Sequence, residues 1–376
     1  MLVVRLGAMG DILHALPAIT ALRVAHPSWK IDWAVDPRWL PLLSAESEDA
    51  RLGAPRTPAR PLVDQIHLVP AKAWGRKPLA SQTWTEIREL RSYLRTPEYE
   101  AVLDLQGSIR SAVVARLSGS RRIVGEAHPR ETPARWLFTE RVTTHGQHVI
   151  EQDLELASAL AGDLLSHVPA TLPLDFEAEQ WCDQLEELQE TVWTGKPVAL
   201  IHPAGGWGAK RWPAERYGAV AEEFAARGGG VLINAGPGEE ALAAQVVAAA
   251  GDSGRVHAVA CSLPQLIAIT RRVSIVIGGD TGPLHLACAL GRPVVGIYGP
   301  TDPKRNGPYG TSFRVLRNPE SRTDHTRRTH PEAGLLTIRP EDVISSLVDL
   351  MLEERRARQD RTREAAENEE REANHS

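Results

Sequence analysis

The chain has 376 residues, a formal net charge of −5 and 42% hydrophobic residues, so we expect two domains with full apolar cores. The acidic balance argues against a nucleic-acid-binding surface, and three scattered cysteines without metal-ligand spacing suit a reducing compartment. No signal peptide and no run of 18 apolar residues is recognisable, so we expect a cytoplasmic protein without a transmembrane helix.

Strand-like and helix-like segments alternate through the first half, which predicts a parallel sheet with crossover helices. The predicted strands cover 2–6, 31–35, 65–69, 101–105 and 122–124, and the predicted helices 11–25, 84–94, 108–118 and 147–160. A Pro- and Ala-rich segment over 44–61 is typical of a surface loop or insertion. Residues 164–173 are the expected interdomain linker.

The pattern restarts in the second half and predicts a second α/β domain. Its predicted strands cover 198–202, 230–234, 256–259 and 273–277, with one more after Pro293, and its helices cover 214–227, 239–249 and 263–271. A C-terminal helix over 341–352 leads into a charged tail, 353–376, which we expect to be disordered or a solvated helix extension. The predicted domains are therefore 1–165 and 175–340.

The segment from Ile275 to Pro303 is the most informative part of the second half. A buried strand ends at two glycines, and Asp280 and Thr281 then suit the start of a helix, with Gly282 and Pro283 in its first turn. A helix start at the carboxyl end of a strand offers free N–H groups to an anion, most commonly a phosphate. His285 shares the helix face of Thr281, although by itself a buried histidine is more often structural.

Two further strand-to-helix loops of the second half are candidate binding sites. Gly205, Gly206 and Lys210 lie in a glycine-rich loop, where backbone amides and a cation could neutralise a diphosphate leaving group. A flexible surface loop is an equally good interpretation. Glu239 and Glu240 follow a third loop and could bond ribose hydroxyls, but both also suit a plain helix start.

The N-terminal strand leads into Gly7-Ala-Met-Gly10-Asp11 and then a helix. With Asp36 as a ribose-binding acid, a nicotinamide-dependent oxidoreductase is conceivable, but the G-x-G-x-x-G fingerprint is incomplete. Asp11 in the first helical turn would face a pyrophosphate of like charge. We therefore interpret Asp11 as a general base for a hydroxyl, or as a simple helix-start carboxylate.

A third group of residues in the first half is polar and basic. Gln106 ends a predicted strand, and an arginine-rich stretch follows within an otherwise acidic chain. We interpret this stretch as a surface for an anionic acceptor, or as a solvated charged face. The candidate residues are Gln106, Arg110, Arg121, Arg122 and Arg130, with Gly10 beside Asp11.

Four segments together resemble the heptosyltransferases of lipopolysaccharide core synthesis, glycosyltransferase family 9. They are RLGAMGDILHALPAITALR, DLQGSIRSA, HPAGGWGAKRWPAERY and GGDTGPLHLACALGRPVVGIYGPTDP, and they span roughly residues 1 to 350 in the family's order. The members most similar are those that add the first heptose to Kdo–lipid A. The resemblance implies a GT-B fold, in which two Rossmann-like domains with parallel sheets bind the acceptor (N-terminal domain) and the nucleotide-sugar (C-terminal domain).

The resemblance also implies a reaction. The donor would be ADP-L-glycero-β-D-manno-heptose, transferred with inversion and without an essential metal or other cofactor. The family's catalytic aspartate falls on Asp11 and its phosphate-binding lysine on Lys210. Donor contacts fall on residues 280–285, a ribose contact on Glu239 or Glu240, and the basic acceptor position on Arg110, where members often carry lysine.

Several functions stay open from the sequence. An anionic, lipid-linked sugar as acceptor implies peripheral contact with the cytoplasmic face of the inner membrane. Heptosyltransferase II, or a family member using another activated sugar, shares the same motifs. The alternatives of another class are an NAD-dependent oxidoreductase and a non-catalytic nucleotide-binding module.

Overall fold

The computed structural model describes residues 1–46, 55–185, 195–324 and 326–373. Residues 47–54 of the predicted 44–61 loop lie outside this range. The chain forms two compact units. Unit 1 comprises Met1–Cys182, Leu263–Ala268 and Lys304–Asn306, and unit 2 comprises Asp183–Ser262, Ile269–Pro303 and Gly307–Ser376. The division after Cys182 lies beyond the predicted linker and assigns 175–182 to the first unit.

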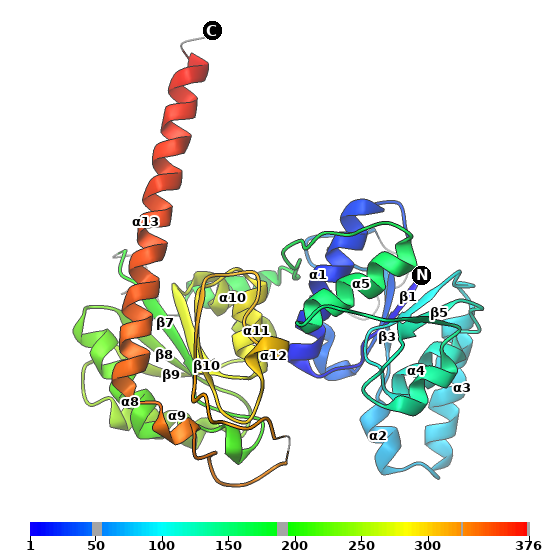
Figure 1. The fold of residues 1–376 in the computed structure, drawn as a ribbon, viewed down its shortest axis with the longest axis horizontal. Helices are drawn as coiled ribbons and strands as arrows, with labels where there is room; N and C mark the ends of the chain where they lie inside the picture. Colours follow the sequence, from blue (N-terminus) through cyan, green and yellow to red (C-terminus); the bar gives the residue numbers. More distant parts are fainter. Residues whose placement is uncertain (47–54, 186–194, 325, 374–376) are drawn as a thin grey trace. The chain divides into compact units, whose positions relative to one another are not determined.

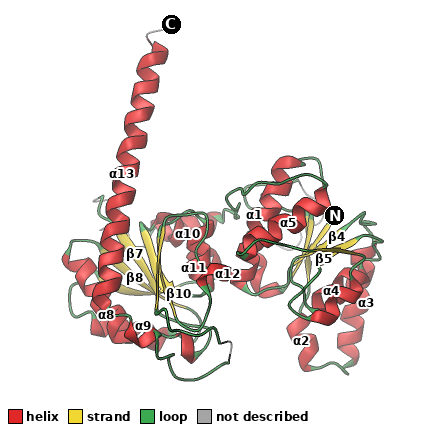
Figure 2. Ribbon diagram, viewed as in Figure 1, coloured by secondary structure: helices red, strands yellow, loops and turns green. Residues whose placement is uncertain are grey.

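Unit 1 is built on a parallel sheet with the order β3-β2-β1-β4-β5-β6. Helices flank this sheet (Figures 1 and 2). The strands are β1 (Leu2–Val4), β2 (Asp32–Val35), β3 (Gln65–Leu68), β4 (Val102–Asp104), β5 (Ile123–Glu126) and β6 (Glu140–Val142). The longer helices are α1 (Met9–Ala25), α3 (Ser81–Arg95), α4 (Ile109–Leu117) and α5 (Val149–Ala161). The predicted strands and helices are confirmed, whereas β6 and the short α2 (Ala71–Arg76) were not expected.

Unit 2 repeats the plan with the order β12-β11-β10-β7-β8-β9, again all parallel. The strands are β7 (Val198–His202), β8 (Gly230–Ala235), β9 (Val256–Ala260), β10 (Ile275–Gly279), β11 (Val294–Tyr298) and β12 (Phe313–Arg317). The helices include α8 (Ala214–Ala226), α9 (Glu240–Ala249) and α11 (Gly282–Ala289). Helix α10 (Leu263–Arg272) is divided, with Leu263–Ala268 in unit 1 and the rest in unit 2. Strands β7 and β10 are buried throughout, as their apolar, β-branched sequences predict.

Numbered within its own unit, each sheet has the strand order 3-2-1-4-5-6 of a doubly wound fold. In such a sheet the connections leave the first and fourth strands in opposite directions. A crevice therefore forms at the carboxyl ends of these two strands, which is where ligands bind. These switch points lie between β1 and β4 in unit 1 and between β7 and β10 in unit 2.

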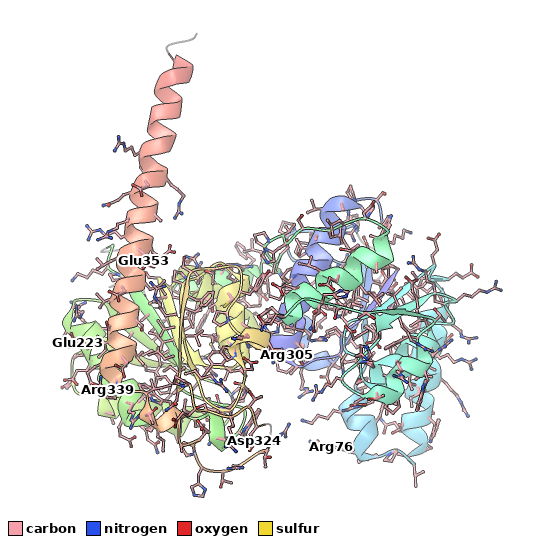
Figure 3. All side chains as sticks on the ribbon, in the orientation of Figure 1. Arg76, Glu223, Arg305, Asp324, Arg339 and Glu353 are labelled. Carbon is pink, nitrogen blue, oxygen red and sulfur yellow. The ribbon has the colours of Figure 1, made fainter. Side chains whose placement is uncertain are left out.

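The C-terminal helix α13 runs from Pro340 to Ala373, far beyond the predicted end. Val343, Leu347 and Leu350 are buried in the core of unit 2 and anchor its first turns. Glu353, labelled in Figure 3, follows the last large apolar residues of the helix. Its Oε1 lies 2.5 Å from Nη2 of Arg314 on β12. The described part of the tail, up to Ala373, is helical.

Candidate functional site

The first switch point presents the carboxylate of Asp11. Chain leaving β1 turns at Gly7 and enters α1, so Asp11 lies in the first helical turn. Its Oδ2 accepts the backbone N–H of Ala8 at 2.8 Å, which fixes the carboxylate at the helix N-terminus. Gly7 has φ +149°, and a Cβ there would lie 2.8 Å from Trp39 Nε1, so only glycine fits the turn.

Arg5 supports Asp11 from the end of β1. Its Nη2 lies 3.3 Å from Asp11 Oδ1, and its Nε donates to the Asp11 carbonyl at 3.1 Å. The Arg5 side chain is 6% exposed and that of Asp11 is 40% exposed. The buried guanidinium therefore balances the charge of the Asp11 carboxylate, while the carboxylate itself stays accessible to solvent. Sequence reasoning missed Arg5, although a lone cation in an apolar buried strand was an available signal.

The Gln106 side chain, which follows β4, is hydrogen-bonded to the backbone that follows β1. Its Oε1 accepts the N–H of Leu6 at 2.7 Å, and its Nε2 donates to Ser108 Oγ at 3.0 Å. The structure thus brings Gln106 beside the turn that carries Gly10 and Asp11, as expected of residues at neighbouring strand ends.

Two buried carboxyl groups lie behind this site. Asp104 accepts the N–H groups of Gln106 and Gly107 on Oδ1, and burial raises its pKa to about 6. Burial raises the pKa of Asp153, on α5, to about 7, against an opposing attraction from Arg5. Within the described part of the chain, neither Asp104 Oδ2 nor Asp153 Oδ2 has a hydrogen-bond partner.

The four predicted acceptor arginines divide between two edges of the sheet. Arg110 and Arg130 follow the carboxyl ends of β4 and β5, the edge that carries Asp11, and both are exposed. Arg121 and Arg122 precede β5 and therefore lie at the opposite edge. Arg122 Nε is 2.9 Å from Glu140 Oε2, and its Nη1 donates to the Leu160 carbonyl at 3.0 Å. The structure does not bring these two arginines to the site.

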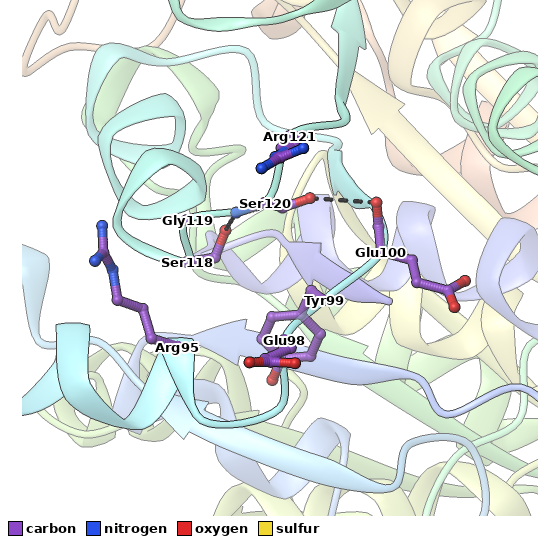
Figure 4. A pocket seen from close by; sticks show the side chains of 8 residues that line it. All are labelled: Arg95, Glu98, Tyr99, Glu100, Ser118, Gly119, Ser120 and Arg121. Atoms are coloured by element: carbon purple, nitrogen blue, oxygen red, sulfur yellow. Dashed lines mark hydrogen bonds between the residues drawn. The ribbon is translucent and has the colours of Figure 1, made fainter.

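A hollow at that opposite edge is also separate from the site (Figure 4). Two of its lining residues are joined by a hydrogen bond, in which Ser120 Oγ donates to the Glu100 carbonyl at 3.3 Å. Because Glu100 and Ser120 precede β4 and β5, the hollow lies at the amino-terminal edge of the sheet. The lining residues are Arg95, Glu98, Tyr99, Glu100 and 118–121.

The second switch point holds a buried ion pair. Lys210 Nζ contacts Asp280 Oδ2 and donates to the Asp280 carbonyl at 3.2 Å, while His285 Nε2 lies 3.0 Å from Asp280 Oδ1. The side chains of Lys210, Asp280 and His285 are 11%, 10% and 5% exposed. Hydrogen bonding to His285 and the charge of Lys210 lower the pKa of Asp280 well below its usual range, despite its burial.

The loop before Lys210 is shaped by glycine and an aromatic ring. A Cβ on Gly205 would lie 3.1 Å from the Lys210 carbonyl, so glycine lets the loop fold back on itself, whereas Gly206 is exposed. Lys210 Nζ lies 4.3 Å from the centroid of the Trp207 ring, within cation–π range. Trp207 was not predicted as a site residue. The sequence signal that could have identified it is a single aromatic residue between two glycines of the loop.

The helix start beside Asp280 agrees with its sequence. Thr281 is the N-cap of α11, its hydroxyl donates to the Gly279 carbonyl at 3.2 Å, and Pro283 lies in the first turn. The Thr281 side chain therefore does not cap the helix. The first-turn N–H groups of a helix are where an anion can bind.

The two candidate ribose carboxylates differ in their surroundings. Glu239 Oε2 accepts the N–H of Gly236 at 3.1 Å, at the carboxyl end of β8, and the residue is half-buried. Glu240 is exposed, and its Oε1 accepts the N–H of Gly238 at 3.1 Å. Nearby, His202 Nδ1 lies 2.9 Å from Asn234 Nδ2, and burial lowers the His202 pKa to about 4.

Comparison with known proteins assigns the family. The sequence model described as glycosyltransferase family 9 (heptosyltransferase) matches residues 87–336, which is more than half of the chain. The chain belongs to glycosyltransferase family 9. Curated relatives include lipopolysaccharide heptosyltransferase 1 of Escherichia coli K12, 28% identical over 85% of this chain and 93% of that protein. Lipopolysaccharide heptosyltransferase 1 of Pseudomonas aeruginosa is 27% identical over 83% and 81%.

Solved structures confirm the fold. The E. coli heptosyltransferase WaaC with ADP superposes with a TM-score of 0.74 at 23% identity, over 93% of this chain and 99% of that one. E. coli ADP-heptose heptosyltransferase II gives 0.72 at 22% identity, over 94% and 99%. The predicted GT-B architecture with two Rossmann-like domains is therefore confirmed.

Among the described residues, no group of three or more His, Cys, Asp or Glu side chains could hold a metal ion. No described helix is long and apolar enough to cross a bilayer.

Proposed function

We propose that this enzyme transfers L-glycero-D-manno-heptose from ADP-heptose to the Kdo of Kdo–lipid A, with inversion at the anomeric carbon. The observation that carries the proposal is the pair of switch points. One presents a half-exposed carboxylate, Asp11, and the other a buried cation beside an open helix start, Lys210 at α11. A transfer of this kind needs one base and one site for a diphosphate.

In the proposed step, Asp11 accepts the proton of the acceptor hydroxyl. The hydroxyl oxygen then forms the new bond to the anomeric carbon, and the bond to the phosphate oxygen breaks, with its electron pair leaving on ADP. The Ala8 N–H and the Arg5 guanidinium already fix the Asp11 carboxylate, so little reorganisation is needed. Arg110 and Arg130 lie at the same edge and are the candidate cations for an anionic acceptor.

Unit 2 is proposed to bind the donor. Lys210 and the first amides of α11 would neutralise the charge that develops on the diphosphate. Glu239 is the better candidate for the ribose hydroxyls, because it is half-buried at the end of β8 whereas Glu240 is exposed. Support comes from a relative: E. coli WaaC, 25% identical, has been solved with ADP-2-deoxy-2-fluoro heptose.

The acceptor separates this proposal from its nearest rivals. Heptosyltransferase 3 of E. coli is also similar, at 26% identity over 91% of this chain, so the family motifs do not select the acceptor. We favour the type 1 activity and a location at the cytoplasmic face of the inner membrane, where a lipid-linked Kdo acceptor would be presented.

Transfer assays with purified enzyme test the proposal. Kdo–lipid A and a heptosylated acceptor are each offered with ADP-heptose and with other nucleotide-sugars, and products are read by mass spectrometry, with the anomeric configuration determined by NMR. Transfer from ADP-heptose to Kdo, retained in EDTA, is the expected result. Product only with the heptosylated acceptor would assign a later step, and product only with another donor would overturn the donor.

A further inference from the structure

One face of α4 combines aliphatic and cationic side chains on the surface of unit 1. Ile109, Val113 and Arg116 recur at helical spacing, and Arg110 lies beside them. Ile109 is 43% exposed and Val113 44% exposed, and both arginines are exposed. Large apolar side chains at these positions are solvated although the opposite face of the helix fills the core.

The 3₁₀ turn η3 (Thr132–Leu137) extends this face, because it packs against α4. Its Trp136 is 64% exposed. Glu131 joins the two elements: its Oε2 accepts the N–H of Ile109 at 2.9 Å, and its own N–H donates to the Gly107 carbonyl at 2.9 Å. We define the α4–η3 patch as the surface formed by Ile109, Arg110, Val113, Arg116, Arg130 and Trp136.

The charge of this region is opposite to that of the chain. Residues 107–141 carry seven arginines and three glutamates, against a net charge of −5 for the whole protein. The three acids are engaged: Glu126 by Thr144, Glu131 by the Ile109 amide, and Glu140 by Arg122. Arg110, Arg116 and Arg130 form no ion pair with any described residue.

We propose that the α4–η3 patch docks the enzyme on the surface of an anionic phospholipid bilayer. An exposed tryptophan with aliphatic neighbours suits the interfacial zone of a membrane, where amphipathic rings and short apolar side chains partition. Unpaired arginines beside them match the phosphates of anionic headgroups. We favour a lipid surface because a bilayer offers anionic phosphates and an apolar interior at adjacent depths, which matches arginines beside exposed aliphatic and aromatic side chains.

The α4–η3 patch lies close in the chain to the switch point of unit 1. Ile109 follows the switch-point residue Gln106 by three positions, and a Cβ on Gly107 would lie 3.2 Å from the Arg130 amide. The patch therefore begins at the edge of the sheet that carries Asp11. This part of the inference rests on the proposed function, because it places Asp11 beside the surface from which a lipid-linked sugar would extend.

Vesicle co-sedimentation of the full-length enzyme tests the docking without any turnover. The probes are phosphatidylcholine vesicles with and without phosphatidylglycerol, and no donor or acceptor is added. The test variant is Arg116→Glu/Trp136→Ser, and the matched control is Arg355→Glu/Phe176→Ser, which makes the same charge change and removes another exposed aromatic ring. Phe176 is 77% exposed, and Arg355 is exposed on α13.

We expect wild type and control to bind anionic vesicles, with binding weakened at high salt, and the test variant to bind roughly tenfold less. Transfer to a water-soluble, deacylated acceptor should be equal in all three proteins, whereas transfer to vesicle-embedded acceptor should fall only in the test variant. Equal binding by test and control variants, or binding to neutral vesicles alone, would overturn the docking. Loss of all transfer in wild type with intact vesicle binding would instead overturn the proposed function.

Discussion

The two switch points occupy equivalent positions in similar sheets, but the carboxylate at each differs in its exposure and in the groups that bind it. Asp11 is 40% exposed and receives one amide and one guanidinium, whereas Asp280 is 10% exposed and is enclosed by Lys210 and His285. An exposed carboxylate with spare lone pairs can accept a proton from a substrate. A buried and fully engaged one instead holds a cation in place. The comparison predicts that Asp11 serves chemistry and Asp280 serves binding and stability.

The largest expected effect comes from Asp11→Asn. The amide is nearly isosteric but cannot act as a base, so kcat should fall by about 10²–10⁴-fold. Thermal melting and ADP affinity by calorimetry should remain at wild-type values, because the side chain is half-exposed and the diphosphate is assigned to unit 2. A variant that turns over at the normal rate would remove Asp11 from the mechanism.

Asp280→Ala should show the reverse pattern, with a loss of stability. It leaves the Lys210 ammonium buried without its partner, so the free energy of unfolding should fall by about 3–5 kcal/mol. Glu223→Ala is the control, because Glu223 pairs with Arg227 where both side chains are exposed, and removing a partner from an exposed pair costs about 1 kcal/mol or less. Urea titration measures both variants. Equal losses in the two variants would contradict the role of Asp280 as the partner of a buried cation.

The pH dependence of stability separates the two units further. The lowered pKa of Asp280 stabilises the fold above the unfolded-state pKa, and this contribution is lost as the pH falls below about 4. The pKa of Asp153 is raised to about 7, so the native state binds more protons than the unfolded state between about pH 4 and 7. Through Asp153, stability therefore falls as the pH rises across that window and levels off above it.

Asp153→Asn should remove the decrease in stability between about pH 4 and pH 7. The variant should be more stable than wild type by about 4 kcal/mol at pH 8 and nearly equal to it at pH 4, as measured by urea titration. Asp252→Asn, at an exposed position, serves as the control and should change neither value. An increase in stability that is the same at both pH values would show that Asp153 is not protonated in the folded state.

The sequence predicted the parts of the fold that local pattern determines. Alternating buried strands and capped helices identified both sheets, and the glycine-rich turns marked both switch points. Strand β6 was missed because two of its three residues, Glu140 and Arg141, are charged and none of the three is buried, so they carry no apolar strand pattern. The structure of the tail could not be predicted from its sequence. Its charged side chains argue against packing in a core, but they are compatible with both a solvated helix and disorder.

Contacts between distant residues explain what the sequence did not reveal about the sites. Lys210 and Asp280 were both predicted to bind the donor, but their ion pair joins positions 70 residues apart and follows only from the pairing of β7 with β10. Arg121 and Arg122 were grouped with Arg110 by charge alone. The direction of β5 separates them, because residues before and after a strand lie at opposite edges of its sheet.

The smallest expected effect comes from the contact between Lys210 and the Trp207 ring. Trp207→Leu removes the aromatic face beneath Lys210 Nζ and should weaken ADP binding by roughly 1 kcal/mol, or about fivefold. Trp207→Phe keeps a π-face and should stay within about twofold of wild type, which separates the ring from its indole N–H. Isothermal titration of ADP into the three proteins provides the comparison. If phenylalanine weakened binding as much as leucine, the indole N–H would be the group that matters, and the cation–π contact would not orient Lys210.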